Sequence, residues 1–458
     1  MNIIRDIAKV SGANTVSLIT GIINGFIVPA FLSLEQYAYL KTFALYLSLA
    51  GILHFGYIDG IYIKYGGKFS HEINPAILKC EKSFLILFQL TIAIVIIIIG
   101  IIVKDLIIIA LAMALLPHNL LAFYQLFYQS IGHFNIYSRI RLIIPALIML
   151  LNILLIYVFR MENYLFYIAA EIFVYLVTVQ YLELKYSFRI KQIKIRSHIK
   201  FIIDHFRVGI FIMAGNLAMI LFFTLGRWVV KLFMTDIDFA YYSFAVSMMQ
   251  IITIVISSIA LTFYPYLSRI HKSGNLSRLK RQLILIGAFF SISYFIFNLI
   301  IHWVIPKYDS AVKIIGILFA SFPAYAVINA LYINMYKVQK KARKYLLTVF
   351  LNLIIACLFV AIALLLRKNT ISVAIATTFA FYFWFYYSSK DFADLAISVR
   401  EILFIFLYVS SYFVAVLCFS PLWALLIFGS ALTLLILSLY RSDATELISK
   451  VIKALDLK

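Results

Sequence analysis

The sequence predicts an all-α membrane protein with about fourteen transmembrane helices. Of its 458 residues, 64% are apolar and only 13% are charged, and the mean hydropathy is +1.02. A soluble domain is typically about 45–50% apolar and about 25% charged. Runs of roughly 20 apolar residues, the length that spans a bilayer, recur along the whole chain between short clusters of Lys and Arg. The apolar side chains are therefore expected to face lipid and one another.

Apolar windows bounded by charged or turn residues place the individual spans. Six spans precede a basic segment that runs from Lys185 to Arg207, and eight follow it. The first six are predicted near residues 12–33, 39–61, 83–103, 106–128, 142–159 and 164–182. The other eight are predicted near 208–231, 239–263, 283–305, 311–334, 345–366, 370–389, 402–420 and 422–440.

The placement of the basic residues predicts the orientation. Of the 40 Lys and Arg residues, 31 lie at the N-terminus, in the even-numbered loops or in the C-terminal tail, and 9 lie at the opposite ends. Cytoplasmic loops carry the excess of Lys and Arg, so both termini are predicted to be cytoplasmic in a multi-pass protein of the cell (inner, cytoplasmic) membrane. A nucleic-acid-binding protein would instead collect its basic residues on one folded face, so the net charge of +21 does not indicate nucleic acid as a partner.

A weak internal repeat at an offset of 202 residues predicts a duplicated bundle. Asn14 maps onto Asn216, residues 37–39 onto 239–241, and Tyr62 onto Tyr264. We therefore predict an N-terminal six-helix bundle over 1–182, a basic cytoplasmic connector over 183–207 and a second six-helix bundle over 208–389. Residues 390–458 are predicted to form two accessory helices and a cytoplasmic tail.

Several segments resemble a known family. They are GYIDGIYIKYGGK at 56–68, YSFAVSMMQ at 242–250 with YPYLSR at 264–269, and PKYDSAVKIIGIL at 306–318 with YKVQKKARKY at 336–345. In pattern and order they resemble the Wzx-type polysaccharide flippases of the multidrug, oligosaccharidyl-lipid and polysaccharide (MOP) exporter superfamily. The resemblance implies a MATE-like fold of two six-helix bundles around a central cavity, with two further helices.

The same resemblance implies a function. The chain is expected to move an undecaprenyl-pyrophosphate-linked oligosaccharide across the cell membrane for O-antigen, capsule or another surface polysaccharide, alongside other polysaccharide-assembly proteins. A lipid II flippase and a cation-coupled drug exporter are the alternatives. A membrane glycosyltransferase or polymerase is a third, which the short outer connections disfavour. No catalytic residue, cofactor or metal site is predicted, because no nucleotide-binding loop and no metal-ligand spacing of the three cysteines is present.

Charged and amide residues inside the spans are candidates for substrate binding, because each charge costs about 2.5–3.5 kcal/mol on insertion scales. On the seventh predicted helix Asn216, Arg227 and Lys231 share a face at 100° per residue, and Gly226 stands where the family often has an acidic residue. Asn14 on the first helix and Lys41 on the second are expected to face the same cavity. Arg227 can bind phosphate oxygens in a bidentate way, while extension of Lys41 and Lys231 to the membrane surface is the competing explanation.

Two acidic residues are candidates for gating or ion coupling. Asp59, near the inner end of the second helix, is expected to pair with a loop cation, and Glu171 on the sixth helix is a candidate proton or cation site. A helix-end ion pair for Asp59 and a hydrogen-bonded glutamate without transport duty are the alternatives. A straight second helix would place His54 about 140° from Asp59, so the sequence predicts no contact between them.

Overall fold

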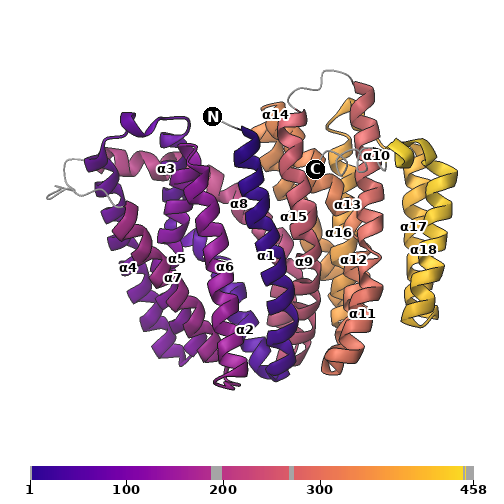
Figure 1. Ribbon diagram of the computed structural model, residues 1–458, viewed down its shortest axis with the longest axis horizontal. Coiled ribbons are helices and arrows are strands. Elements are labelled where there is room, and N and C mark those ends of the chain that lie inside the picture. Colours follow the sequence, from indigo (N-terminus) through magenta and orange to yellow (C-terminus); the bar gives the residue numbers. More distant parts are fainter. Residues whose placement is uncertain (1–2, 187–198, 268–272, 447–448, 450–458) are drawn as a thin grey trace. The chain divides into compact units, whose positions relative to one another are not determined.

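The computed structural model describes residues 3–186, 199–267, 273–446 and 449. The described residues contain helices and no strand, as Figure 1 shows. Eleven helices are long and apolar enough to cross a membrane, and two pairs of helices joined by a sharp bend bring the number to 13 if each pair is one span. The first predicted span falls on a further helix whose described apolar part, Leu18–Phe31, is shorter. The chain is therefore a multi-pass membrane protein, and each of the fourteen predicted windows coincides with a helix.

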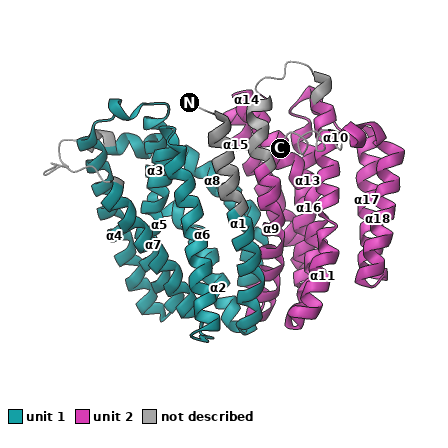
Figure 2. Cartoon of the chain, in the orientation of Figure 1, with its two compact units in different colours: residues 1–231 teal, residues 232–458 magenta. Residues whose placement is uncertain are grey.

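The described chain forms two compact units, coloured separately in Figure 2, residues 1–231 and 232–458. This division differs from the predicted bounds, because the helix over 208–231 belongs by its contacts to the first unit and was predicted to open the second bundle. The grouping into six, six and two helices stays a prediction.

The first unit contains eight α-helices. They are α1 (Ile3–Phe31), α2 (Leu34–Leu47), α3 (Tyr57–Tyr65), α4 (Pro75–Val103), α5 (Leu106–Ser130), α6 (Phe134–Tyr157), α7 (Tyr164–Tyr186) and α8 (Ile199–Phe233), whose last two residues enter the second unit. Short polar motifs set several of their starts. Asn74 accepts a hydrogen bond from the backbone N–H of Ala76 ahead of α4, and Asp105 accepts those of Ile107 and Ile108 ahead of α5, as N-cap residues do.

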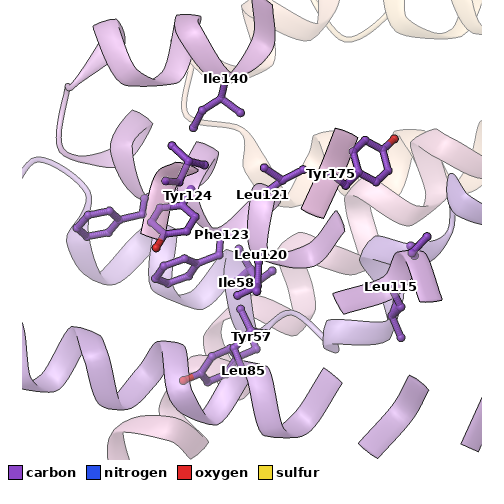
Figure 3. Close-up of a cluster of buried hydrophobic side chains, with 14 of the residues drawn as sticks. Tyr57, Ile58, Leu85, Leu115, Leu120, Leu121, Phe123, Tyr124, Ile140 and Tyr175 are labelled. Carbon is purple, nitrogen blue, oxygen red and sulfur yellow. The ribbon is translucent and has the colours of Figure 1, made fainter. Parts of the chain in front are cut away.

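An aromatic and aliphatic cluster fills the centre of the first unit. Tyr57 and Ile58 of α3, Leu85 of α4 and Phe123 of α5 are all buried in it, and Figure 3 shows them together. Packing between membrane helices depends on such close van der Waals contact, since lipid is as apolar as the side chains. This cluster packs α3, α4 and α5 together, and several of the polar groups described below, such as Asp59, Gln89 and Asn119, lie on these helices.

The second unit contains the remaining helices. They are α9 (Asp236–Leu267), α10 (Ser273–Phe290), α11 (Ser293–Val304), α12 (Asp309–Phe319), α13 (Phe322–Val327), α14 (Ile333–Val338), α15 (Ala342–Leu366), α16 (Thr370–Ser389), α17 (Val399–Cys418) and α18 (Pro421–Leu439). A π-helical turn, η5 (Ile328–Tyr332), joins α13 to α14. Helices α17 and α18 pack on each other, and α18 also packs against α11, where Phe428 lies against Phe295.

Two predicted spans are bent, and the assumption of straight helices was wrong for both. The second span consists of α2, a 3-10 turn over Ala50–His54 and α3, with a bend of 61°. The tenth span consists of α12 and the α13–η5–α14 segment, with a bend of 51°. The first bend follows from the backbone, because Phe55 and Gly56 both have left-handed φ values of 49° and 81°, a conformation that ends a helix.

The predicted orientation gives the first testable result. In a variant without the native cysteines, a single cysteine at Arg160 should react with a membrane-impermeant maleimide added outside spheroplasts. A single cysteine at Lys340 should react only after the membrane is opened. Labelling of both positions from the same side would contradict the prediction that the loop at 158–163 is outside and the loop at 339–341 is inside.

Candidate functional site

The bend between α2 and α3 brings together two side chains that a straight helix would point in different directions. His54 Nε2 lies 3.9 Å from Asp59 Oδ2, and both side chains are buried. The expectation that these residues make no contact was wrong, because the 100° rule does not hold across the 3-10 turn and the two left-handed residues. Asp59 stands in the first turn of α3, where the positive end of the helix dipole favours an anion.

Two of the predicted site residues, Asp59 and Asn216, contact each other. The Asn216 amide of α8 donates to Asp59 Oδ1 over 3.3 Å. Asp59 is therefore held by an amide and a histidine from within the first unit, whereas the sequence predicted a loop cation as its partner.

Amide side chains also donate hydrogen bonds to backbone carbonyl groups in the 3-10 turn between α2 and α3. Asn119 of α5 donates to the carbonyl oxygen of Ala50 over 3.2 Å, and Gln89 of α4 donates to that of Leu53 over 3.1 Å. Asn119 also donates to Gln89 Oε1 over 2.7 Å, and both amides are fully buried. A broken helix is tolerated in a membrane only where neighbouring groups take up its free backbone hydrogen bonds.

Three glycines bring α8 against α3. Gly56 and Gly60 are four residues apart, as in the G-x-x-x-G pattern of closely packed membrane helices, and Gly209 of α8 lies between them. A Cβ on Gly209 would overlap the carbonyl oxygen of Gly56 and come to 2.6 Å from Gly60 N, and one on Gly60 would overlap the backbone of His205. The glycines of the segment GYIDG therefore set the distance at which Asn216 reaches Asp59.

A second polar group lies around Lys41 in α2. Its ammonium interacts electrostatically with the Arg227 guanidinium and with the Glu171 carboxylate, and it lies 5.2 Å from the centre of the Tyr37 ring. Glu171 accepts a hydrogen bond of 2.5 Å from the Tyr175 hydroxyl. The Lys41 ammonium is thus within electrostatic reach of both Arg227 and Glu171, and the roles predicted for these residues stay predictions.

Arg227 is held away from the lipid. Its side chain is buried, with 8% of its surface exposed, and the adjacent Trp228 ring stacks on Tyr46 at 5.6 Å between centroids. Lys231 follows one turn later on α8 and is half-buried. Because two cations and one carboxylate leave a net positive charge among Lys41, Arg227 and Glu171, this neighbourhood can attract an anion. The side chain of Asn14 lies outside the described residues.

Sequence reasoning missed a buried carboxylate at the start of α4. Glu81 accepts hydrogen bonds from Lys64 Nζ at 2.5 Å and from the Tyr65 hydroxyl at 2.8 Å. Its carboxylate also lies 2.7 Å from His205 Nε2. Only 1% of Glu81 is exposed. Its partners come from α3 and α8, so this cluster joins the same helices as the three glycines, near the opposite end of α3 from the break.

The second unit contains a long apolar groove between α12, α16 and α17. Its volume is about 820 Å³. Its walls include Ile317, Ile375, Phe379, Phe406, Phe413 and Leu417, and Lys313 contributes a cation. From Ile402 to Leu417 the groove follows α17 for about 22 Å at 1.5 Å per residue. The groove thus presents an apolar surface along most of α17.

No metal centre is indicated, since among the residues that the structure describes no three His, Cys, Asp or Glu side chains are placed to hold an ion.

Comparison with known proteins bears on the fold. No protein-family model and no curated protein sequence matches this chain.

Solved structures do match. A structure of the lipid II flippase MurJ in an inward closed conformation matches with a TM-score of 0.62 and 15% identity, over 96% of this chain and 99% of that one. An inward-facing multidrug resistance MATE family transporter of the MOP superfamily matches with a TM-score of 0.54 and 15% identity, over 84% and 95%. This chain therefore has the same polytopic helical fold as these two solved structures.

Proposed function

We propose that the protein is a flippase that carries an undecaprenyl-pyrophosphate-linked oligosaccharide from the cytoplasmic to the outer leaflet by alternating access of its two units. The observation that carries this proposal is the grouping of Lys41 and Arg227 within membrane-spanning helices of the first unit, with Glu171 as the carboxylate beside them. Charges are retained inside spans mainly at sites that meet water, a partner or a charged substrate. A pyrophosphate leaving water needs compensating positive charge.

The apolar groove of the second unit supports a cargo with a long lipid chain. Its lining of Ile, Phe, Val and Leu offers a polyprenyl chain the same surroundings as the bilayer. The groove is as long as most of a span, and Lys313 in its wall lies near the start of α12. We assign this groove to the lipid chain of the cargo and the Lys41–Arg227 neighbourhood to its pyrophosphate.

Coupling to an ion is proposed for the two acidic residues. Asp59 has Asn216 and His54 as partners, and Glu171 has Tyr175 and Lys41. Either carboxyl can gain or lose a proton or cation while its amide, imidazole or phenol partner stays in place. In this proposal Asp59 senses the position of α8, because its amide partner is on that helix.

Two related functions share the fold. The MurJ structure is that of a lipid II flippase and the MATE structure that of a multidrug transporter. Lipid II also carries a saccharide on a prenyl pyrophosphate, so the cation pair fits it equally well. Drug resistance conferred by the gene, with increased drug sensitivity when it is deleted, would instead favour the exporter. For a glycosyltransferase or polymerase, the short connections at 104–105 and 158–163 leave little outer surface for an acceptor.

Substitution of Arg227 tests the pyrophosphate role. In a strain lacking the gene, Arg227→Lys should reduce restoration of surface polysaccharide by about tenfold, because lysine keeps the charge but cannot bind phosphate oxygens in a bidentate way. Arg227→Gln should reduce it further. The measurement is surface polysaccharide, together with the lipid-linked precursor that accumulates inside the cell.

Arg367→Gln is the matched control, because Arg367 is exposed at the end of α15. It should restore export fully. Membrane abundance of each variant is measured, so that lost folding is not mistaken for lost binding. Full export by Arg227→Gln at normal abundance would show that the pyrophosphate role is wrong.

A further inference from the structure

A row of uncharged polar side chains crosses the middle of α9 in the second unit. Gln250, Thr253 and Ser257 are three and four residues apart and so lie on one face of the helix. Gln250 is about 21 Å from the start of α9 at 1.5 Å per residue, well inside the candidate span Asp236–Ser258. Its side chain is exposed.

Exposing an amide side chain to lipid at this depth costs free energy. Polar groups in the hydrocarbon region are expensive unless they are hydrogen-bonded or face water. Among the described residues, the Gln250 amide side chain has no hydrogen-bond partner, while the Gln250 backbone carbonyl accepts from the Thr253 hydroxyl at 2.9 Å. The Gln250 amide is therefore best explained by a water-filled surface or by a polar ligand.

The segment that contacts this row is irregular and places two polar side chains, those of Tyr325 and Asn329, against it. Asn329 Nδ2 donates to Ser257 Oγ over 2.8 Å and to the Tyr325 hydroxyl over 3.3 Å. The Tyr325 hydroxyl also interacts with Ser257 and Thr253. Asn329 lies in the π-helical turn η5, and π-helical turns occur mostly as single turns at functional sites.

We infer that Gln250, Thr253, Ser257, Tyr325 and Asn329 form a recognition face for the sugar part of the cargo. All five are neutral amides or hydroxyls, which both donate and accept hydrogen bonds, as sugar hydroxyl and acetamido groups do. None of the five carries a charge, so this face offers no countercharge to the pyrophosphate and suits the neutral part of the cargo. This inference rests on the proposed function. It assigns recognition of the sugar to the second unit, whereas the cations of the first unit are assigned to the pyrophosphate.

Adhesion between helices is the competing explanation for these contacts. It accounts for the bonds of Asn329 to Ser257 and Tyr325. It does not account for Gln250, whose exposed amide joins no helices. Gln250→Leu therefore separates the two explanations, and its exposure makes a folding defect a minor concern.

The experiment compares export with binding of the sugar-free carrier. Gln250→Leu and Asn329→Leu are tested for surface polysaccharide in the deletion strain, and as purified full chains in nanodiscs for binding of undecaprenyl pyrophosphate. Export should fall about tenfold for each, the loss of about one good hydrogen bond, while binding of undecaprenyl pyrophosphate stays within twofold of the unchanged protein. Arg227→Gln should lose both.

A matched pair of serines provides the control. Ser257→Ala should reduce export, whereas Ser258→Ala should not, because Ser258 points to another face of α9 and donates to the carbonyl of Ile254 in its own helix. Normal export by Gln250→Leu, or a parallel loss of undecaprenyl pyrophosphate binding, would overturn the inference. If the unchanged protein binds no undecaprenyl pyrophosphate and its deletion leaves polysaccharide export intact, the proposed function fails and the inference fails with it.

Discussion

Gly209→Ala is expected to remove most of the folded protein from the membrane. The added Cβ would overlap the carbonyl oxygen of Gly56 and lie 2.6 Å from Gly60 N. These are backbone atoms of α3, so no side chain can rotate away to make room. Overpacking a tight contact costs about 1–3 kcal/mol where side chains can shift, and more where they cannot, so we expect at least about 3 kcal/mol here.

The measurement is the yield of monodisperse protein after extraction in mild detergent, together with its melting temperature. Gly429→Ala is the control, because a Cβ at Gly429 of α18 meets nothing within 4 Å. Alanine there should leave yield unchanged and should slightly favour the helix. A normal yield and melting temperature for Gly209→Ala would mean that α8 does not approach α3 as closely as the structure shows.

Lys280→Met is expected to cause the second large loss of stability. The Lys280 ammonium, 1% exposed, lies 2.8 Å from Glu401 Oε2 and donates to the carbonyl oxygens of Leu395 and Ala396 at 3.0 and 2.9 Å. Its three donors thus have three acceptors. Glu401, 2% exposed, also accepts from the backbone N–H of Ser398 at the start of α17. Removing one partner of a buried pair costs about 3–5 kcal/mol, because the other charge stays buried.

The double change Lys280→Met with Glu401→Leu should cost less than the two single changes added together. It leaves no buried charge, although the carbonyls of Leu395 and Ala396 lose their donor. Melting temperatures of the purified variants measure the difference, with Lys368→Met at an exposed position as the control. Additive losses would mean that the Lys280–Glu401 contact contributes little.

The spans were predictable because the bilayer imposes their length and composition. A window of about 20 apolar residues has few alternatives to a spanning helix, and all fourteen windows fall on helices. The two bends were not predictable from this pattern. The first bend occurs where Phe55 and Gly56 take left-handed conformations, and the second occurs at the short turn between Phe319 and Phe322. A hydropathy window assumes one regular helix and detects neither.

The candidate residues were found one by one, and their partners were not. Asp59 and Asn216 stood out because polar residues are rare inside spans, but their hydrogen bond depends on how α8 packs on α3. Glu81, His205 and Lys280 were passed over for a common reason. Each falls just outside a predicted window, in what was taken for a loop, whereas the structure places each of them inside a helix and buries it. Hydropathy windows end where charges begin, and buried charges near helix ends are therefore counted as loop residues.

The amides that repair the break in the second span constrain the order in which the protein is made. The carbonyl groups of Ala50 and Leu53 receive their donors from Asn119 and Gln89, which the ribosome adds roughly 35 to 70 residues later. Polar backbone groups within a bilayer are costly unless they are hydrogen-bonded. We therefore expect the second span to reach its bent form only after α4 and α5 have inserted beside it, so that this helix is completed late although it is synthesised early.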